Sequence, residues 1–245
     1  MNVIKQQLIN KKYKPLVDNI DRYFMESNVV LQDDRNMIKV IDFNNESLVI
    51  KSYKKPSFFI GFIYTFVQKS KAWRAYEYGL RISEFTPGVI ARIEYLNPLL
   101  SKSYLICEKF EAEFNLQKPL FYNHPDKEAI FSQFAEFVYE LHQQDIFHKD
   151  LSPGNILIKK SGEKYQFKII DINRMSFKKL SKRQRAENFN KLWAHDSDLE
   201  LMLKVYAKSA QFDEESFVRL GLEFNQKNKD RKTRKRKIKQ ALGLW

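Results

Sequence analysis

The stretch HKDLSPGNILI at residues 148–158, with IIDIN at 169–173 after it, decides the fold of this chain. An apolar pattern with helical spacing at 126–145 precedes the first stretch, and a turn at Ser161-Gly162 separates two short apolar strands that follow it. Asp, Asn, Pro and Gly are each ordinary turn residues. Their occurrence in register between a helix and two strands is much harder to obtain by chance, so the pattern indicates a functional loop.

The spacing of the polar residues in these stretches suits phosphoryl transfer. Asp150 and Asn155 lie five residues apart in one loop, and Asp171 follows a strand sixteen residues later. Transfer from MgATP needs one carboxylate facing the acceptor hydroxyl, and a second carboxylate with an amide oxygen to hold Mg²⁺ against the phosphates. The pattern matches the catalytic and metal loops of the protein-kinase-like fold, H-[RK]-D-L-x-x-x-N and a later Asp.

The N-terminal half supports the same interpretation. Segments 38–43 and 47–53 are rich in β-branched residues and flank Asn44-Asn45-Glu46, which predicts a hairpin. Lys51 ends a Val-Ile-Lys run where kinases carry the lysine that contacts the ATP phosphates, and a predicted helix at 70–82 carries Glu77 to pair with it. Taken singly, Lys51 would be an edge-strand charge and Glu77 a surface helix charge. The order of the segments favours the pair.

Two further strands are predicted at 89–95 and 103–110. Glu108 and Phe110 then fall where a hinge would join two lobes and offer backbone groups to an adenine ring. The chain is therefore predicted to have an α+β, two-lobed protein-kinase-like fold. Its N-lobe, residues 1–110, would be a small antiparallel sheet with one helix, its C-lobe, residues 111–226, would be mostly helical, and residues 227–245 would form a basic tail.

Composition sets the outer limits. Hydrophobic residues make up 43% and aromatic residues 14% of the 245 residues, which excludes global disorder. A single cysteine excludes an intramolecular disulfide framework and a zinc site with several thiolates. The four histidines show no metal-ligand spacing, and we interpret His124, His142 and His195 as surface or core residues. The N-terminus lacks the apolar stretch of a secretory signal, so an intracellular protein is expected.

Two segments bear on partners. Residues 227–239 hold nine basic residues and one acidic residue, +8 of the total +13, which is typical of a solvated helix end or of a segment that contacts nucleic acid or an anionic membrane. The absence of aromatic residues there disfavours nucleic acid. The apolar run 58–67 is too short to span a bilayer. We favour a buried segment that packs in the N-lobe; the alternative is a membrane-facing segment flanked by lysines.

The chain also resembles the bacterial lipopolysaccharide kinases that phosphorylate Kdo or heptose sugars of the inner core. The similarity extends over about residues 30–180, and the D-L-S-P-G-N and D-I-N-R-M segments are closer to this family than to Ser/Thr protein kinases, as is the absence of an A-P-E segment after Asp171. The pieces that carry the resemblance are Arg35–Val40, Val49–Pro56, Ser70–Glu77, Ser101–Tyr104, His148–Leu157 and Asp171–Met175.

The resemblance implies a role for each site residue. Asp150 would be the catalytic base, Asn155 and Asp171 would bind Mg²⁺, and Lys51 and Glu77 would position ATP. From its place in the loop we expect His148 to orient that loop rather than to transfer a proton. Lys149 would approach the transferring phosphate or face solvent. Arg174 would contact an anionic acceptor or form a salt bridge within its lobe. The chain departs from the protein-kinase pattern in two ways. Residues 1–60 contain no glycine, so 33–39 would form a non-glycine turn over the phosphates, and Asn173 replaces the glycine of D-F-G.

The function expected from these observations is ATP-dependent transfer of the γ-phosphate to a sugar hydroxyl, of Kdo or heptose, in the lipopolysaccharide inner core. The cofactors would be ATP and Mg²⁺, and the partner a lipopolysaccharide core or lipid A-linked sugar. Such an enzyme would be cytoplasmic and held peripherally at the inner face of the inner membrane, mainly by the basic tail. The alternatives are a kinase of a small molecule or protein, and a pseudokinase or nucleic-acid-binding module that uses the tail.

Overall fold

The computed structural model describes residues 3–243, so the first two residues of the predicted N-lobe and the last two of the predicted tail lie outside the described residues. The chain forms two compact units. Unit 1 comprises the residues up to Glu111 together with Asp171–Asn173, and unit 2 comprises Ala112–Ile170 and the residues from Arg174 onward. The short segment Asp171–Asn173 thus packs with residues that precede it by more than sixty positions.

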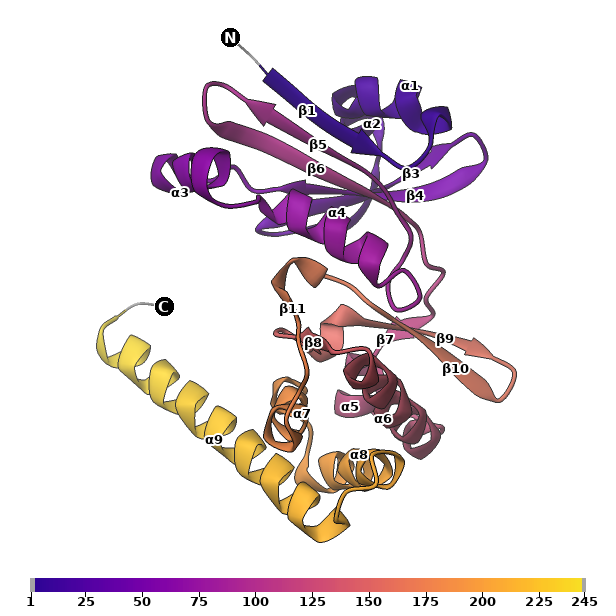
Figure 1. Ribbon diagram of the computed structural model, residues 1–245, viewed down its shortest axis with the longest axis vertical. Helices are drawn as coiled ribbons and strands as arrows, with labels where there is room; N and C mark the ends of the chain where they lie inside the picture. Colours follow the sequence, from indigo (N-terminus) through magenta and orange to yellow (C-terminus); the bar gives the residue numbers. More distant parts are fainter. Residues whose placement is uncertain (1–2, 244–245) are drawn as a thin grey trace. The chain divides into compact units, whose positions relative to one another are not determined.

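Unit 1 is built on one antiparallel sheet of six strands (Figure 1). Strand β1 lies at one edge although it comes first in the chain, because it pairs with β5. The strands, in spatial order, are β1 (Val3–Leu8), β5 (Val89–Leu96), β6 (Leu100–Glu108), β4 (Glu46–Tyr53), β3 (Asn36–Phe43) and β2 (Val29–Asp33).

The predicted hairpin is β3–β4. Phe43 pairs with Glu46, so the loop has two residues, Asn44 and Asn45, with φ of 52° and 62°. A two-residue turn of this kind needs positive φ at both positions, and asparagine tolerates it better than most residues. The turn fixes the register that places Lys51 opposite Ile38.

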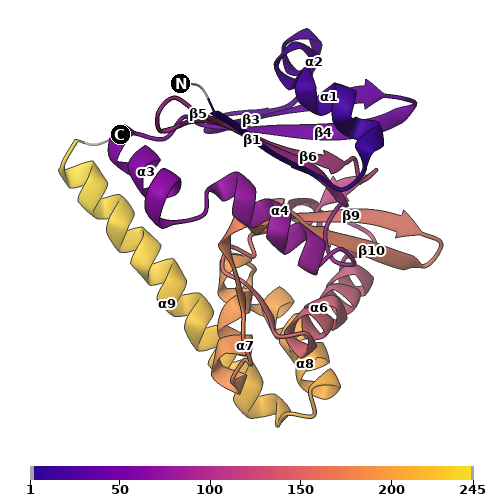
Figure 2. The ribbon, with the colours of Figure 1, turned by 45° about the horizontal axis from the view of Figure 1, so that its top comes forward.

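Helices cover both faces of this sheet (Figure 2). On one face, α1 (Lys14–Asp18) and α2 (Ile20–Glu26) bury Leu16 and Ile20 in a core with Leu48 and Ile50 of β4. On the other face lie α4 (Lys71–Arg81), which is the predicted helix, and α3 (Phe58–Phe62). Strand residues alternate between faces, so Lys51 points to the face opposite that of Ile50.

The expectation that residues 58–67 are buried is wrong. They form α3 and a single π-helical turn, Ile63–Val67, and Gly61 is the one residue of the two elements that is buried. Phe58 is 84% exposed and Val67 73% exposed. The hydrophobicity of the run indicated burial, but the segment approaches strand β6 through Gly61 and Thr65.

Unit 2 is mostly helical, with two small sheets of strand order β10-β9-β7 and β11-β8. Its core lies between α6, α8 and α9, where the rings of Tyr206 and Phe217 stack with centroids 5.1 Å apart. The main elements are β7 (Phe114–Asn115), α5 (Gln117–Phe121), α6 (Lys127–Gln143), β8 (Ile146–His148), β9 (Ile156–Ser161), β10 (Lys164–Ile169), β11 (Met175–Phe177), α7 (Lys182–Asn188), α8 (Asp196–Ser209) and α9 (Glu214–Ala241). Single 3-10 turns lie at Lys11–Tyr13, Pro153–Asn155, Ile172–Arg174 and Phe189–Lys191.

The predicted basic tail is the outer part of α9. This helix begins at Glu214, with the Asp213 side chain accepting a hydrogen bond from the Ser216 N–H, and packs Phe217 and Phe224 into unit 2. Asn228 is the last buried residue, and residues 230–241 are exposed. None of the helices within residues 3–243 is both long and apolar enough to cross a membrane.

Candidate active site

The loop after β8 is held by the buried ring of His148. Its Nδ1 accepts the Asp150 N–H at 3.1 Å, so its Nε2 carries the proton and donates to the Ile170 carbonyl, also at 3.1 Å. One imidazole therefore ties the start of the loop to the last residue before Asp171. This is the geometry of a positioning residue, in keeping with the role that the sequence analysis gave His148.

Backbone and amide bonds shape the rest of the loop. The Asp150 carbonyl accepts from the Ser152 N–H at 2.8 Å and from the Asn155 Nδ2 at 3.0 Å. The Ile170 N–H in turn donates to the Asn155 carbonyl at 2.9 Å. The Asn155 side chain uses its nitrogen to brace the loop, so its Oδ1 is the atom suited to a cation.

The Asp150 carboxylate is partly exposed and faces a cation. Arg174 Nη1 lies 3.9 Å from Asp150 Oδ2, so Arg174 forms the salt bridge within unit 2 that was one of its two predicted roles. The Lys149 N–H donates to the Arg174 carbonyl at 3.1 Å, and the Lys149 side chain is exposed. Asp150 is therefore reachable from solvent, as a base that meets an acceptor must be.

In unit 1, Lys51 and Asp171 form an ion pair although 120 positions separate them. Lys51 Nζ lies 2.7 Å from Asp171 Oδ1, and the same oxygen accepts from Asn173 Nδ2 at 2.7 Å. Asp171 has a φ of 55°, a left-handed conformation that aspartate tolerates. The buried Asn173 thus orients the carboxylate. Asn173, which stands in place of the glycine of D-F-G, makes a contact that was not predicted, although its spacing of two residues from Asp171 allows it.

The structure does not form the expected pair between Lys51 and Glu77. The Glu77 carboxylate instead lies 2.6 Å from Lys69 Nζ and accepts from Trp73 Nε1 at 2.7 Å. Partial burial raises the pKa of the Glu77 carboxyl, but the bonds from Lys69 and Trp73 outweigh it and lower that pKa below its usual value. Trp73 lies one helical turn before Glu77, which explains why this local contact forms.

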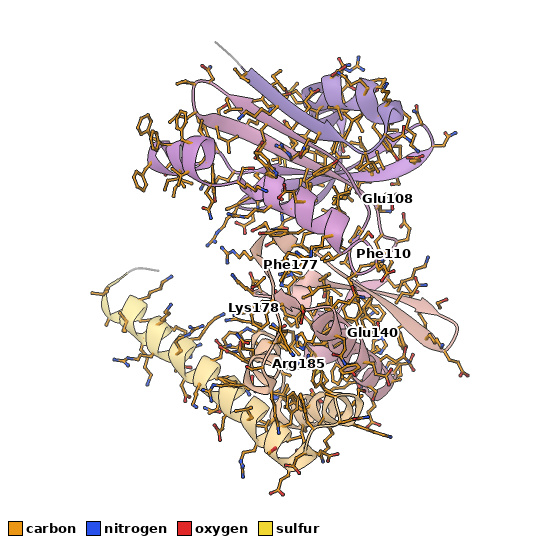
Figure 3. The ribbon with its side chains drawn as sticks, viewed as in Figure 1. Glu108, Phe110, Glu140, Phe177, Lys178 and Arg185 are labelled. Carbon is orange, nitrogen blue, oxygen red and sulfur yellow. The ribbon has the colours of Figure 1, made fainter. Side chains whose placement is uncertain are left out.

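Glu108 and Phe110 lie on the segment that ends unit 1 (Figure 3). The Glu108 N–H already donates to the Gly88 carbonyl, and the Lys109 N–H to the Ser47 carbonyl. Within residues 3–243 the Phe110 N–H has no backbone acceptor. Of these three residues, Phe110 is therefore the one whose N–H is not donated to another backbone group. The predicted phosphate-covering turn, 33–39, contains the connection between β2 and β3.

Lys191 interacts with Asp150 and with two cations of α9 in unit 2. Burial lowers the pKa of the Lys191 ammonium, Arg231 and Lys232 lower it further, and Asp150 opposes them. Lys232 Nζ also lies 3.9 Å from the centre of the Trp193 ring, and the Asn228 Nδ2 donates to the Asn190 carbonyl at 2.7 Å, which fixes α9 here. These contacts were not predicted from the sequence, because Lys191 and the cations of α9 lie about forty and eighty residues after Asp150.

A buried polar chain supports the loop from behind. His142 is a core residue; its Nδ1 lies 2.8 Å from the Tyr206 hydroxyl and its Nε2 3.0 Å from Asn188 Oδ1. Asn188 Nδ2 donates to the His148 carbonyl at 2.8 Å. Arg185, on α7 (Figure 3), donates to the Tyr206 hydroxyl at 3.3 Å. These contacts connect α6, α7 and α8 to the residue that begins the loop.

Each unit carries one oxygen donor of the kind that Mg²⁺ takes. Asp171 supplies a carboxylate and Asn155 an amide oxygen, which are hard donors of the kind that Mg²⁺ takes. Across residues 3–243 there is no group of three or more His, Cys, Asp or Glu that could hold a metal ion. Either donor alone would therefore leave most of the coordination of Mg²⁺ to oxygen atoms of other groups, such as phosphate and water.

Comparison with protein families gives the decisive match. Residues 74–216, more than half of the chain, match the model of the lipopolysaccharide kinase (Kdo/WaaP) family. The chain belongs to this family. The match confirms the resemblance noted in the sequence and assigns the protein to the kinase phosphotransferases. It includes Glu77, Asp150 and Asp171 but begins after Lys51.

One similar solved structure supports the fold. A structure described as WaaP in complex with acyl carrier protein is 14% identical, with a TM-score of 0.61, and the alignment covers 92% of this chain and 98% of that one. The Rio2 kinase–ADP/Mg²⁺–phosphoaspartate complex from Chaetomium thermophilum is 16% identical with a TM-score of 0.47, over 85% and 66% of the two chains. Comparison with curated proteins finds no match. The similarity to WaaP confirms the predicted kinase-like α+β fold.

Proposed function

We propose that this lipopolysaccharide kinase family member transfers the γ-phosphate of MgATP to a hydroxyl of a Kdo or heptose sugar in the inner core. The observation that carries the proposal is the His148–Asn155 loop, in which a buried imidazole fixes a solvent-accessible Asp150. The lipopolysaccharide kinase family makes a sugar acceptor a better candidate than a nucleic acid.

In this proposal the chain's residues divide the chemistry. Asp150 accepts the proton of the acceptor hydroxyl as its oxygen bonds to the γ-phosphorus, and the bond to the β-phosphate oxygen breaks to leave ADP. Asn155 and Asp171 hold Mg²⁺, which neutralises charge on the phosphates. Lys51 contacts the α- and β-phosphates, and His148 positions the loop. Lys149 and Arg174 lie beside Asp150, and their positive charges would stabilise the negative charge of the transferring phosphate.

In this proposal Lys51 and Asp171 would exchange partners when the nucleotide binds. Asp171 would hold Mg²⁺, and the Lys51 ammonium would contact phosphate oxygens. We assign Glu77 to Lys51 in that state, which requires the Glu77 carboxylate to leave Lys69; both side chains are partly exposed, so little burial opposes the exchange. The Phe110 backbone N–H is the donor we assign to adenine, with Glu108 beside it.

The cations near Asp150 favour an anionic acceptor. Arg174 and Lys191 bring positive charge to Asp150, and Arg231 and Lys232 add to the charge around Lys191. Kdo bears a carboxylate, whereas an unmodified heptose is neutral, so these residues favour Kdo. A lipid A-linked Kdo would lie at the cytoplasmic face of the inner membrane, which is where we place the enzyme.

The test uses purified protein with MgATP and separate acceptors: lipid A-linked Kdo, a heptose-containing core, a protein and an aminoglycoside. Mass spectrometry of each product locates the phosphate. We expect phosphate on Kdo, and an Asp150→Asn variant should lose about 10² to 10⁴ in rate while it still binds nucleotide. Asp42→Asn, the same substitution at an exposed strand position, is the matched control.

Two results would contradict the proposal. Near-normal turnover of Asp150→Asn would remove Asp150 as the base. Phosphate found on the aminoglycoside or protein, with none on either sugar, would remove the sugar acceptor.

A further inference from the structure

The segment Phe58–Val67, here called the aromatic helix, presents large apolar side chains to solvent. Phe58 and Phe59 are 84% and 70% exposed, and Phe66 is 67% exposed. Ile60, Phe62 and Val67 are exposed as well, and the Phe62 and Phe66 rings pair with centroids 5.0 Å apart. Exposed apolar patches of this kind mark binding surfaces, because isolated exposed residues are common but contiguous groups are not.

Small and polar groups attach the aromatic helix to its unit. A Cβ at Gly61 would lie 3.4 Å from the Leu100 carbonyl oxygen, so the helix backbone approaches strand β6 closely. The Thr65 hydroxyl donates to the Gly61 carbonyl at 2.7 Å and accepts the Leu100 N–H at 3.0 Å. The π-helical bond from the Gln68 N–H to the Ile63 carbonyl widens this turn. Gly61 and Thr65 therefore attach the helix to the sheet, and the exposed phenylalanines are not needed for that attachment.

Positive charge borders the aromatic helix. Between Lys54 and Lys71 the chain carries four lysines and no acidic residue. Three of them, Lys54, Lys55 and Lys71, line a cavity of about 370 Å³ together with Ile60 and Tyr64. No carboxylate within residues 3–243 pairs with these three lysines, whereas Lys69 pairs with Glu77. The lysine ammonium groups and residues of the aromatic helix thus line the same cavity.

We propose that the aromatic helix docks on an anionic phospholipid bilayer. Phe58, Phe59 and Phe66 would enter the boundary between headgroups and acyl chains, and Lys54, Lys55 and Lys71 would hold a lipid phosphate. Ten residues cannot span a bilayer but can lie in its plane. The aromatic residues suit the acyl-chain region of such a membrane, and the lysines, with no acidic residue among them, suit its negative headgroups.

This assignment differs from the one made from the sequence, which gave membrane binding mainly to residues 227–239. Electrostatic attraction by a basic helix end is long-range and weakens with salt, whereas inserted phenylalanines keep their contribution at high salt. The docking proposal requires neither nucleotide nor sugar, so its test is separate from that of the proposed reaction.

The experiment is sedimentation of the full chain with vesicles of phosphatidylethanolamine and phosphatidylglycerol, compared with neutral phosphatidylcholine vesicles. Phe58→Ser/Phe59→Ser should weaken binding about tenfold or more, because it removes the inserted apolar surface. Met25→Ser/Tyr122→Ser is the matched control: these side chains are 73% and 71% exposed elsewhere, and binding should stay unchanged. Lys54→Gln/Lys55→Gln should remove most of the preference for the anionic vesicles.

A tail variant, Lys235→Gln/Arg236→Gln/Lys237→Gln, separates the two surfaces. We expect it to bind nearly as the unmodified chain does at 0.3 M salt, where surface charges are screened. The proposal is overturned by unmodified protein that stays in the supernatant with anionic vesicles, or by Phe58→Ser/Phe59→Ser binding as tightly as the control. If that double variant fails to fold, Phe66→Ser, on the next turn, gives the same test.

Discussion

Lowering the pH should destabilise unit 2 through His142. Burial lowers the pKa of His142 to about 4, the bond to Asn188 opposes this shift and the charge of Arg185 adds to it. The geometry explains the direction. Nε2–H donates to Asn188 Oδ1 and Nδ1 accepts from Tyr206, so the neutral ring satisfies both partners and a second ring proton would face a hydroxyl that already donates.

The magnitude follows from the two states of the ring. The unfolded chain binds a proton on this histidine near pH 6.5, and the native state does so near pH 4. Between these values the unfolded state holds more protons, so the free energy of unfolding falls as the pH falls. Above pH 6.5 the ring is neutral in both states and the free energy of unfolding is at its full value. Between pH 6.5 and pH 4 it falls by about 1.4 kcal/mol for each pH unit, so about 3 kcal/mol is lost by pH 4.

Urea unfolding of the wild type and of His142→Gln between pH 7.5 and 4.5 measures this effect. Glutamine keeps one donor and one acceptor but does not titrate in this range, so subtracting the two curves removes the contributions of other groups. The difference in unfolding free energy should shrink by about 2 to 3 kcal/mol towards the acid end. A difference that is constant with pH would refute the assignment of a neutral, buried His142.

Two other predictions concern the nucleotide residues and the packing of unit 1. Lys51→Met should weaken MgATP binding about tenfold or more, and Asp171→Asn should remove the dependence of ATP binding on Mg²⁺. Calorimetry measures both effects. Unchanged affinity in both variants would contradict the proposed roles. Gly79→Ala should lower the unfolding free energy by about 1 to 2 kcal/mol in chemical denaturation, because a Cβ there would collide with the stiff side chain of Val89, whereas Leu80→Ala, exposed on the same helix, should have little effect.

Local patterns in the sequence predicted the elements that local forces determine. Helix α4 begins one residue after the cap expected at Ser70, whose hydroxyl accepts the Trp73 N–H, and the two asparagines form the hairpin turn. Strand β1 was missed because it is mostly exposed, with polar residues on both faces, and acquires its structure by pairing with β5, more than eighty positions away. The sequence of Val3–Leu8 therefore does not indicate that the segment pairs with β5.

The candidate site divides in the same way. The contacts of His148, Asp150 and Asn155 lie within one loop and its neighbouring strand, so their spacing indicated them. The partner of Lys51 depends on which residue 26 or 120 positions away comes closest, and the structure selects Asp171 over Glu77. The aromatic helix could not be predicted for a different reason. Hydrophobicity indicates a tendency to be buried, but Gly61 and Thr65 determine which face of the segment contacts the sheet, and the phenylalanines on the other face remain exposed.

The outer part of α9 has a consequence for its helix–coil equilibrium. Beyond Asn228 no burial supports the helix, and like charges at spacings of three and four residues, such as Arg231 with Lys235 and Lys232 with Arg236, each disfavour it by about 0.2 to 0.5 kcal/mol. Counterions or a polyanion would relieve that repulsion. The helical content of residues 230–241 should therefore rise with ionic strength, which makes this segment an intrinsic sensor of the charge density around the enzyme.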